Sequence, residues 1–370
     1  MEKSVTATTA LLIQPGSGTT ALIDAIDRAR TRIHVVIFRF DRREIEMALK
    51  RAARRGVFVH ALVAHTSAGQ GGEITLRKLE MRLLADGITV TRTASDLVRY
   101  HNKMTIIDGE TLYLLGFNYT YLDIDRSRSF GIITQEKRWV EEAEKLFMAD
   151  TTRQQYTPEC ETFVVSPGNS RKHLTALLAS AQRQLLIYDD KLSDPDIMRL
   201  LAVKVRAGLD VRVIGSVGRR ALGVKSGALF MRLHAQVIIR DGEQMFLGSQ
   251  SLRQLELDAR REAGLILDDP AIIKAVTATF EADWSKIHSA HATVYEALEE
   301  ADFDEAEEQA IVSAAPPDLP PAAAAELVKA AVKEAIKDAI LETIEPAATT
   351  LPLKEAIKEA AREALHELAK

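Results

Sequence analysis

Two short segments of the chain carry the same spacing of chemically competent residues, 133 positions apart. One runs from His101 to Asp108 and the other from His234 to Asp241, and each reads His-x-Lys/Gln-x4-Asp. Histidines at matching points of two repeated halves indicate one shared site on a pseudo-twofold axis. Such a site suits attack on the phosphorus of a phosphodiester from one side and protonation of its leaving oxygen from the other.

A lysine in the first segment supplies a charge that this chemistry needs. A phosphodiester is anionic, so a site without a metal ion has to neutralise the non-bridging oxygens with cations or N–H donors. Lys103 follows His101 by two residues, which predicts that both side chains leave one face of a strand. We therefore predict that His101, Lys103 and His234 are the catalytic residues and that no metal is bound.

The two histidines need different protonation states, and nearby carboxylates decide which is which. The reference pKa of histidine, near 6.5, makes both states accessible. Glu262 follows His234 by 28 residues, and the equivalent position after His101 is Ser129. A carboxylate beside His234 would raise its pKa and favour its role as an acid. We expect Glu262 to orient His234, and His101 to be the nucleophile.

The resemblance between the halves extends well beyond these segments. The turn at residues 14–18 matches 166–170, and the offset then stays at 152 residues through four predicted elements. These are helices at 21–32 and 173–184, strands at 33–38 and 185–188, helices at 45–54 and 197–206, and strands at 57–63 and 209–214. An additional helix at 73–86 and strand at 88–92 in the first half change the offset to 133. This pattern predicts two α/β units with mixed sheets, packed side by side.

Composition and charge narrow the class of protein. The lone Cys160 excludes an internal disulfide, and no apolar run approaches the ~20 residues of a membrane span. Residues 291–370 carry 18 Asp and Glu against 7 Lys and Arg, so the remaining 290 residues have a net charge of +6. A basic body favours an anionic substrate. A cytoplasmic protein is the simplest interpretation, with peripheral contact at the inner membrane surface as an extension of it.

The sequence suggests four regions. We predict an N-terminal half at 1–155, a C-terminal half at 156–295, an acidic and proline-rich linker at 296–325, and an amphipathic, alanine-rich helical tail at 326–370. The tail is open to two interpretations. Its helices pack on themselves or on the body, or they mediate self-association or binding of a partner.

The paired motifs resemble those of the phospholipase D superfamily over about residues 10–285. The resemblance implies two tandem α/β/α halves related by a pseudo-twofold axis, a phosphohistidine intermediate and no cofactor. The family asparagine, ten residues after the motif aspartate, matches Asn118 in the first half, and Ser251 takes that place in the second. With Gln236 and Glu262, these residues are expected to bind or orient the phosphate. Asp108 and Asp241 match positions that brace the fold.

The second motif departs from the family pattern. Gln236 stands where the second lysine is expected, so an N–H donor is kept and a unit charge is lost. A charged hydrogen bond is worth about 1.5–3 kcal/mol, which is roughly ten- to a hundredfold in rate. We expect a slow or narrowly specific enzyme.

Three functions are compatible with these features. The first is a hydrolase or phosphatidyltransferase acting on phospholipid, the second a nuclease cleaving DNA or RNA, and the third a non-catalytic relative that binds phosphoryl ligands. Two fused halves in one chain favour the lipid enzymes of the superfamily. Aromatic residues make up 5% of the chain, and no aromatic and basic pattern suited to base stacking is present. Phospholipid is therefore favoured over nucleic acid.

Overall fold

The computed structural model describes residues 8–65, 72–218 and 220–299. The chain divides into two compact units, and the first, Met1–Glu281, contains the duplicated α/β body with both histidine motifs. The predicted linker and alanine-rich tail lie outside the described residues from position 300 onward.

The first half forms a mixed sheet with the strand order β1-β8-β7-β6-β2-β3-β4. Strands β2, β3 and β4 run parallel to one another, and the remaining neighbours in this order are antiparallel. The strands are β1 (Thr9–Gln14), β2 (Arg32–Ile37), β3 (Phe58–Val63), β4 (Thr89–Arg92), β6 (Met104–Ile107), β7 (Thr111–Leu115) and β8 (Ser127–Thr134).

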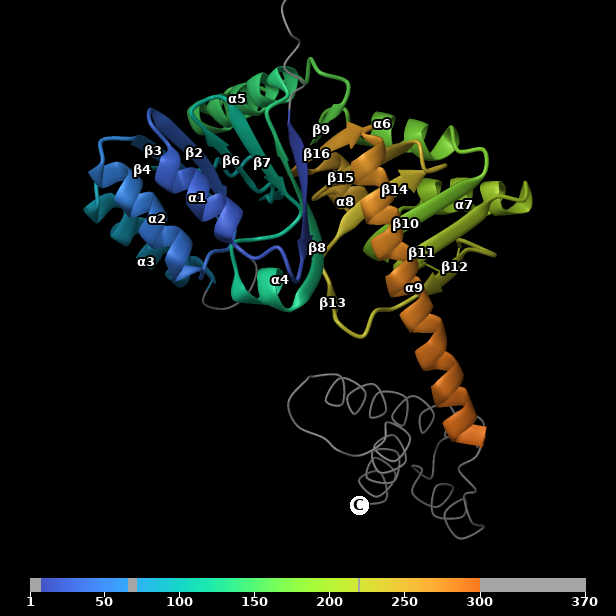
Figure 1. Ribbon diagram of the computed structural model, residues 1–370. Coiled ribbons are helices and arrows are strands. Elements are labelled where there is room, and N and C mark those ends of the chain that lie inside the picture. The colour runs from blue at the N-terminus through green and yellow to red at the C-terminus, as the bar shows by residue number, and fades with distance from the viewer. Residues whose placement is uncertain (1–7, 66–71, 219, 300–370) are drawn as a thin grey trace, which may run out of the picture. The chain divides into compact units, whose positions relative to one another are not determined.

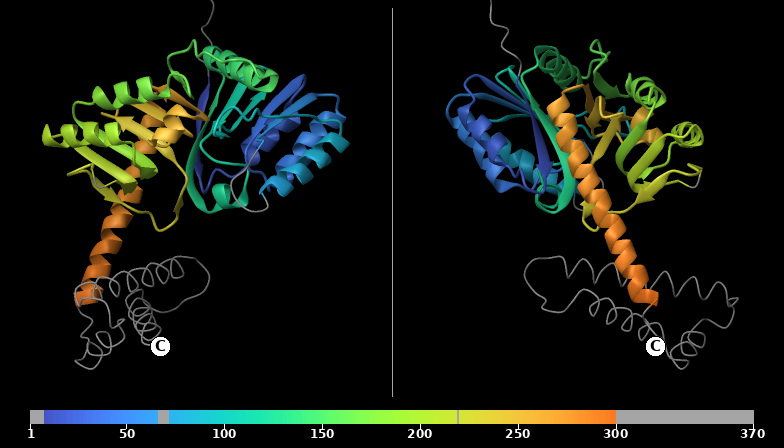
Figure 2. Two further views of the ribbon diagram at one scale, coloured as in Figure 1. Left: turned by 180° about the vertical axis from the view of Figure 1, so that it is seen from behind. Right: turned by 45° about the vertical axis from the view of Figure 1, so that its right-hand side comes forward.

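The second half repeats this order with equivalent strands, as β9-β16-β15-β14-β10-β11-β12. Its strands are β9 (Phe163–Ser166), β10 (Gln184–Leu192), β11 (Asp210–Val217), β12 (Lys225–Gly227), β14 (Gln236–Arg240), β15 (Gln244–Gly248) and β16 (Arg260–Leu267). The predicted duplication and the mixed sheets are confirmed, and Figures 1 and 2 show the two sheets side by side.

Each sheet gains its eighth strand from the opposite half. Strand β5 (Arg99–Tyr100) belongs to the first half but pairs in parallel with β16, and β13 (Arg232–Leu233) belongs to the second half but pairs in parallel with β8. These two short strands come directly before the histidine motifs. The exchange therefore places the first motif beside β16 and the second beside β8, each being the last strand along the chain of the opposite half.

Helices cover both faces of the sheets, as an α/β/α arrangement requires. In the first half α1, α2 and α3 pack over one apolar core, and α5 contacts β6 and β7. In the second half α6 and α7 contribute to the equivalent core. The helices are α1 (Thr20–Arg28), α2 (Arg43–Arg54), α3 (Gly72–Ala85), α4 (Tyr121–Asp125), α5 (Lys137–Thr152), α6 (Ser170–Ala179), α7 (Pro195–Arg206), α8 (Gln254–Asp258) and α9 (Pro270–Glu299).

Local sequence explains where the repeated helices begin and end. Asp194 caps α7, because its carboxylate accepts from the backbone amides of Asp196 and Ile197. Helices α2 and α7 are followed by Gly56 and Gly208, whose φ values of 88° and 89° favour glycine.

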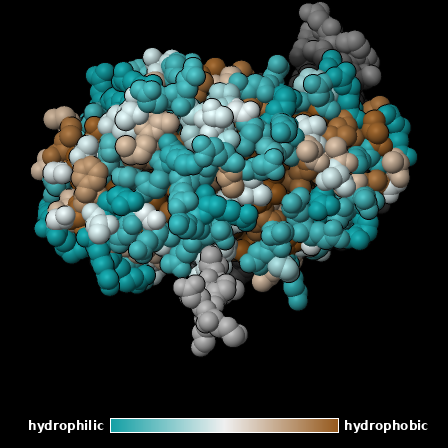
Figure 3. All heavy atoms as spheres, turned by 90° about the horizontal axis from the view of Figure 1, so that it is seen from above, coloured by the Kyte–Doolittle hydropathy of each residue, from teal (hydrophilic) through white to brown (hydrophobic). Residues whose placement is uncertain are grey.

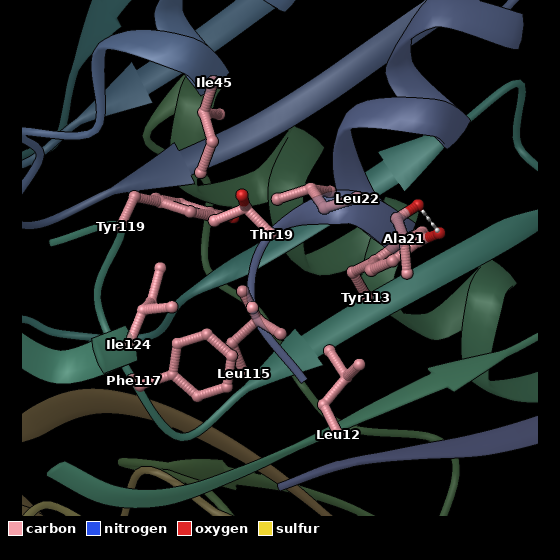
Figure 4. A pocket seen from close by; sticks show the side chains of 11 residues that line it. Leu12, Thr19, Ala21, Leu22, Ile45, Tyr113, Leu115, Phe117, Tyr119 and Ile124 are labelled. Atoms are coloured by element: carbon pink, nitrogen blue, oxygen red, sulfur yellow. Dashed lines mark hydrogen bonds between the residues drawn. The ribbon is translucent and has the colours of Figure 1, made fainter. Parts of the chain in front are cut away.

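A small apolar pocket lies in the core of the first half, beside α1 (Figure 4). Phe117 and Tyr119 line this pocket, and the hydroxyl of Tyr113 donates to the carbonyl of Ala21 at its edge. Asn118 stands between the two core aromatics and makes its contacts elsewhere, with Asp123. Packing of its neighbours therefore fixes the direction of the Asn118 side chain.

The two halves approach each other closely where β7 and β15 end. A Cβ added to Gly116 would lie 2.9 Å from the carbonyl oxygen of Phe130 and 3.0 Å from that of Gly248. Backbone atoms cannot give way as flexible side chains do, so this approach requires glycine at position 116.

The surface offers no extended apolar face in the view of Figure 3, where hydrophilic residues predominate and hydrophobic ones form small separate groups. Within the part of the chain that the structure describes, no helix is long and apolar enough to span a membrane.

The motif aspartates join each motif to the strand that pairs with it. Asp108 accepts hydrogen bonds from the backbone amides of Arg30, Thr31 and Arg32, and Asp241 accepts from those of residues 182–184. Both residues have a φ of 56°, which Asp tolerates better than most residues. They lie at the far end of β6 and β14 from the histidines, where they hold the turn.

We expect Asp108→Ala to lower the free energy of unfolding by about 1–3 kcal/mol, because the substitution leaves several amides without an acceptor. Asp108→Asn keeps one acceptor oxygen and should cost less, and the exposed Glu110→Ala should cost little. Midpoints of urea unfolding measure these differences.

Burial opposes ionisation of Asp108, but the amides of Thr31, Arg30 and Arg32 outweigh it and hold its pKa below 3.8. The stabilisation is therefore complete above pH 3.8 and is lost as the pH falls through the lowered pKa. An Asp108→Ala protein as stable as the wild type at pH 7 would contradict this role.

Candidate active site

The two predicted histidines lie together between the halves. The ring centroids of His101 and His234 are 6.5 Å apart, and the ring planes are inclined by 40°. The exchanged strands hold them there: the backbone amide of His101 donates to the carbonyl of Arg261 (2.7 Å), and that of His234 donates to Arg128 (3.0 Å). Each histidine is thus attached to the last strand of the opposite half.

Lys103 lies against the first histidine. Its Nζ is 3.1 Å from both ring nitrogens of His101, and the residue is 2% exposed. The predicted continuous strand is wrong, however, because residues 101–103 connect β5 and β6 without belonging to either. The close approach of the ammonium to the imidazole is therefore a property of this connection.

A carboxylate from the opposite half contacts Nδ1 of each histidine. Both carboxylate oxygens of Glu262 lie 3.0 Å from Nδ1 of His101, and Oδ2 of Asp123 lies 2.8 Å from Nδ1 of His234. The predicted contact between Glu262 and His234 is wrong. The cause is the strand exchange, because His101 is attached to β16 next to Glu262, whereas His234 is attached to β8.

Sequence reasoning missed Asp123. Ser129, the equivalent of Glu262, donates to the carbonyl oxygen of Asp123 (3.3 Å), and the Asp123 side chain supplies the carboxylate for His234. The second-half equivalent of Asp123 is Glu256, again 133 residues later. That match of two acidic residues was the available signal.

Asn118 and Ser251 bind neighbouring carboxylates. The amide Nδ2 of Asn118 donates to Oδ2 of Asp123 at 2.7 Å, and its backbone amide donates to the same oxygen at 2.9 Å. The backbone amide of Ser251 donates to Glu256 at 2.9 Å, and its hydroxyl donates to Asp189 at 2.5 Å. The expected role of Asn118 and Ser251 in phosphate binding remains a prediction, and their contacts here position acids.

Gln236 lies at the start of β14, directly opposite Asp189 on β10. Among the described residues its side chain makes no hydrogen bond, although it is only 7% exposed. The equivalent of Asp189 in the first half is Ile37, at the offset of 152 residues. The loss of the second lysine therefore accompanies a new buried acid beside it.

Electrostatics distinguish the two histidines. Burial and the nearby charges of Lys103 and His234 hold the pKa of His101 well below 6.5. Burial also lowers the pKa of His234, but Asp123 opposes that effect. Burial opposes ionisation of Asp123, yet His234, the amide of Asn118 and Arg232 hold its pKa far below the usual value. His101 is therefore the more persistently neutral histidine.

Burial also changes the charges next to His101. It lowers the pKa of Lys103 to about 8, although Glu262 and Asp123 favour its charged form. Burial raises the pKa of Glu262. Among the described residues, no three His, Cys, Asp or Glu side chains gather as metal ligands.

Comparison with known proteins gives matches to sequence families and to folds. Residues 22–151 match the family model described as "Cardiolipin synthase, PLD-like domain". A curated relative, the mitochondrial cardiolipin hydrolase of Danio rerio, is 28% identical over 129 residues, which are 34% of this chain and 54% of the relative. The chain thus spans about half the length of that relative.

Two solved structures share the fold over most of the chain. The polyphosphate kinase of Porphyromonas gingivalis matches 74% of this chain and 46% of its own length, with a TM-score of 0.63 and 17% identity. The phosphatidylserine synthase of Haemophilus influenzae matches 75% of this chain and 86% of its own length, with a TM-score of 0.58 and 12% identity. At these identities the likeness concerns the fold, which includes both halves.

The family match covers the first half, and the second half repeats its strand order and its histidine motif. Residues 22–151 therefore carry a phospholipase D-like domain, and the second half of the chain repeats the fold of that domain.

Proposed function

We propose that this protein is a phosphodiesterase or phosphatidyltransferase that acts on phospholipid through a phosphohistidine intermediate. The observation that carries the proposal is the pairing of two histidines, each with a carboxylate at Nδ1, beside one buried lysine. With a carboxylate at Nδ1 of each ring, Nε2 is the nitrogen that would react with substrate, and on His101 this atom also lies 3.1 Å from Nζ of Lys103.

In the first step, Nε2 of His101 attacks phosphorus. The N–P bond forms, the bond from phosphorus to the leaving oxygen breaks, and protonated His234 donates a proton to the departing alkoxide. Glu262 accepts at Nδ1 of His101 and stabilises the positive charge that develops on the ring. Lys103 stabilises the negative charge on the phosphoryl oxygens.

In the second step, His234 is neutral and acts as the base. It takes a proton from water or from an acceptor alcohol, whose oxygen attacks phosphorus as the N–P bond breaks. Hydrolysis and transfer differ only in the acceptor. The lowered pKa of His101 supports its role as nucleophile. Burial lowers the pKa of His234 as well, but Asp123 opposes that effect, and this supports His234 as acid and base.

Phospholipid is the substrate class that the relatives favour. The description of the matching family model names a cardiolipin synthase, and the curated relative is a cardiolipin hydrolase. Both descriptions name reactions at a glycerol phosphodiester, which is the chemistry that the paired histidines suit.

The proposal is tested with phosphatidylglycerol in mixed micelles, with EDTA present. We expect release or transfer of the phosphatidyl group, and a loss of about 100-fold or more in kcat for His101→Ala and for His234→Ala. The matched control is His173→Gln, which changes a histidine on α6 outside the site.

The two histidine variants should differ in their covalent state. Acid-quenched His234→Ala protein should carry a phosphatidyl adduct at position 101, detected by mass spectrometry of peptides. The adduct accumulates because the first step remains faster than the second step, which lacks its base. His101→Ala protein should carry none. An adduct on another residue, or turnover that survives His101→Ala, would reject the phosphohistidine mechanism. Cleavage of DNA or RNA with no lipid turnover would reject the substrate class.

The pH dependence of kcat/KM reports groups of the free enzyme. Burial lowers the pKa of Lys103 to about 8, so activity should fall as the pH rises through 8 and the ammonium loses its proton. Because Glu262 favours the charged lysine, Glu262→Gln should move this limb to lower pH. Glu110→Gln, a change of the same kind at an exposed position, should leave it in place. An alkaline limb near the ordinary lysine value of 10.5, or one unmoved by Glu262→Gln, would contradict the assignment.

Restoring the second lysine alone should not restore a symmetric site. In Gln236→Lys the ammonium would face Asp189, so it would pair with that carboxylate and leave the phosphate. We expect this variant to change kcat by less than about threefold. The triple variant Gln236→Lys, Asp189→Ile and Ser251→Asn recreates the first-half pattern, and we expect kcat to rise about tenfold. A tenfold gain from Gln236→Lys alone would show that Asp189 does not control this position.

A further inference from the structure

The pseudo-twofold axis relates two arginines that have different partners. Arg99 and Arg232 are 133 residues apart, and each lies two residues before a catalytic histidine on an exchanged strand. Arg232 forms an ion pair with Asp123 and donates to the hydroxyl of Ser127 at 2.9 Å. Among the described residues, no carboxylate lies within ion-pairing distance of Arg99.

The reason is that the counterpart carboxylate is already neutralised. Glu256, the equivalent of Asp123, is 2.6 Å from a guanidinium nitrogen of both Arg253 and Arg260. Their first-half equivalents are uncharged, being Thr120 and Ser127. Arg253 and Arg260 therefore pair with Glu256, the carboxylate that the pseudo-twofold axis would place opposite Arg99.

Arg99 nevertheless lies beside the nucleophile. Its guanidinium carbon is 5.6 Å from the centre of the Phe38 ring, and that ring packs edge-on against His101 with centroids 4.5 Å apart. Arg39 contacts the same ring at 5.8 Å, and Arg260 is paired with Arg99 between β16 and β5. Burial, together with the charges of Arg260 and Arg39, lowers the pKa of Arg99, although the charges of Glu262 and Glu256 oppose this. An added anion would relieve the repulsion among these cations.

A polar hollow of about 220 Å³ adjoins this arginine. Arg99 lines it together with His65, Thr93 and Ser95, whose side chains carry hydrogen-bond donors, and the rest of the lining is Ala94, Leu97, Val98 and Tyr100. The corresponding face at His234 differs, because the equivalent of Phe38 there is the acidic Asp190. The His101 side therefore combines this hollow with an arginine that, among the described residues, has no carboxylate within ion-pairing distance.

We propose that Arg99 and this hollow form a second anion subsite, which binds another phosphoryl group of the lipid close to the scissile phosphodiester. The inference rests on the proposed function and narrows its substrate class to lipids with two phosphoryl groups. Arg99 determines specificity here, and the chemistry at phosphorus remains with His101, Lys103 and His234.

Turnover is compared for phosphatidylglycerol and phosphatidylglycerophosphate, which differ by one terminal phosphate. Wild-type protein should prefer the second lipid by about tenfold or more in kcat/KM, and Arg99→Gln should bring the ratio close to one. Arg99→Lys should retain part of the preference. Arg28→Gln removes the same charge from α1 outside the site and should leave the ratio as in the wild type. A ratio near one in the wild type, or a preference that survives Arg99→Gln, overturns the subsite.

Equilibrium binding separates this inference from the proposed function. Isothermal titration with pyrophosphate and with methyl phosphate requires no turnover. We expect wild-type protein to bind pyrophosphate about tenfold more tightly than methyl phosphate, and Arg99→Gln to lose this difference. This result without lipid turnover would retain the subsite and reject the lipid. If Arg99→Gln weakens the binding of pyrophosphate and of methyl phosphate equally, Arg99 attracts anions in general and the inference is overturned. Preferred cleavage of a 5′-phosphorylated dinucleotide would overturn the assignment to lipid.

Discussion

The exchange of two short strands is the constraint on which the site depends. Strand β5 pairs with β16 and β13 pairs with β8, so the backbone amides of His101 and His234 are bound to carbonyls of the opposite half. Neither half alone supplies a histidine and the carboxylate at its Nδ1. The site is therefore complete only when both halves are docked, and this explains why a close backbone approach at Gly116 matters for chemistry as well as for packing.

Duplication supplied two equivalent sets of residues, and divergence has since given them different tasks. The strand orders of the two sheets are the same, yet the second half has Gln236 where the first has Lys103, and the buried Asp189 where the first has Ile37. It also has Arg253 and Arg260, which pair with Glu256, where the first half has Thr120 and Ser127. These changes concern charge, and the strand order of the two sheets is kept. A pseudosymmetric scaffold can thus hold an asymmetric field, as a reaction with one nucleophile and one acid requires.

Spacing along the chain predicted the elements of the fold and the residues that meet, but not their partners. The constant offsets identified the repeated helices and strands, and the matched histidines indicated a shared site. The spacing places Glu262 beside the histidine of its own half, because nothing in it reveals that two strands of only two residues each are exchanged. Asp123 was missed for a related reason. Its role follows from the crossing of His234 to β8, and the sequence shows only that it matches Glu256.

The burial of so many ionisable groups sets a limit on how symmetric this site can be. Charged groups removed from water are tolerated where opposite charges and hydrogen bonds surround them. Lys103 meets this condition through Glu262 and Asp123, and even so its pKa falls to about 8. A second buried lysine would need a further anion of its own. With Glu256 already held by two arginines, Asp189 is the acid directly opposite position 236, and pairing with it would draw that lysine away from phosphate. A neutral Gln236 avoids this competition, and one lysine remains to stabilise the phosphoryl group.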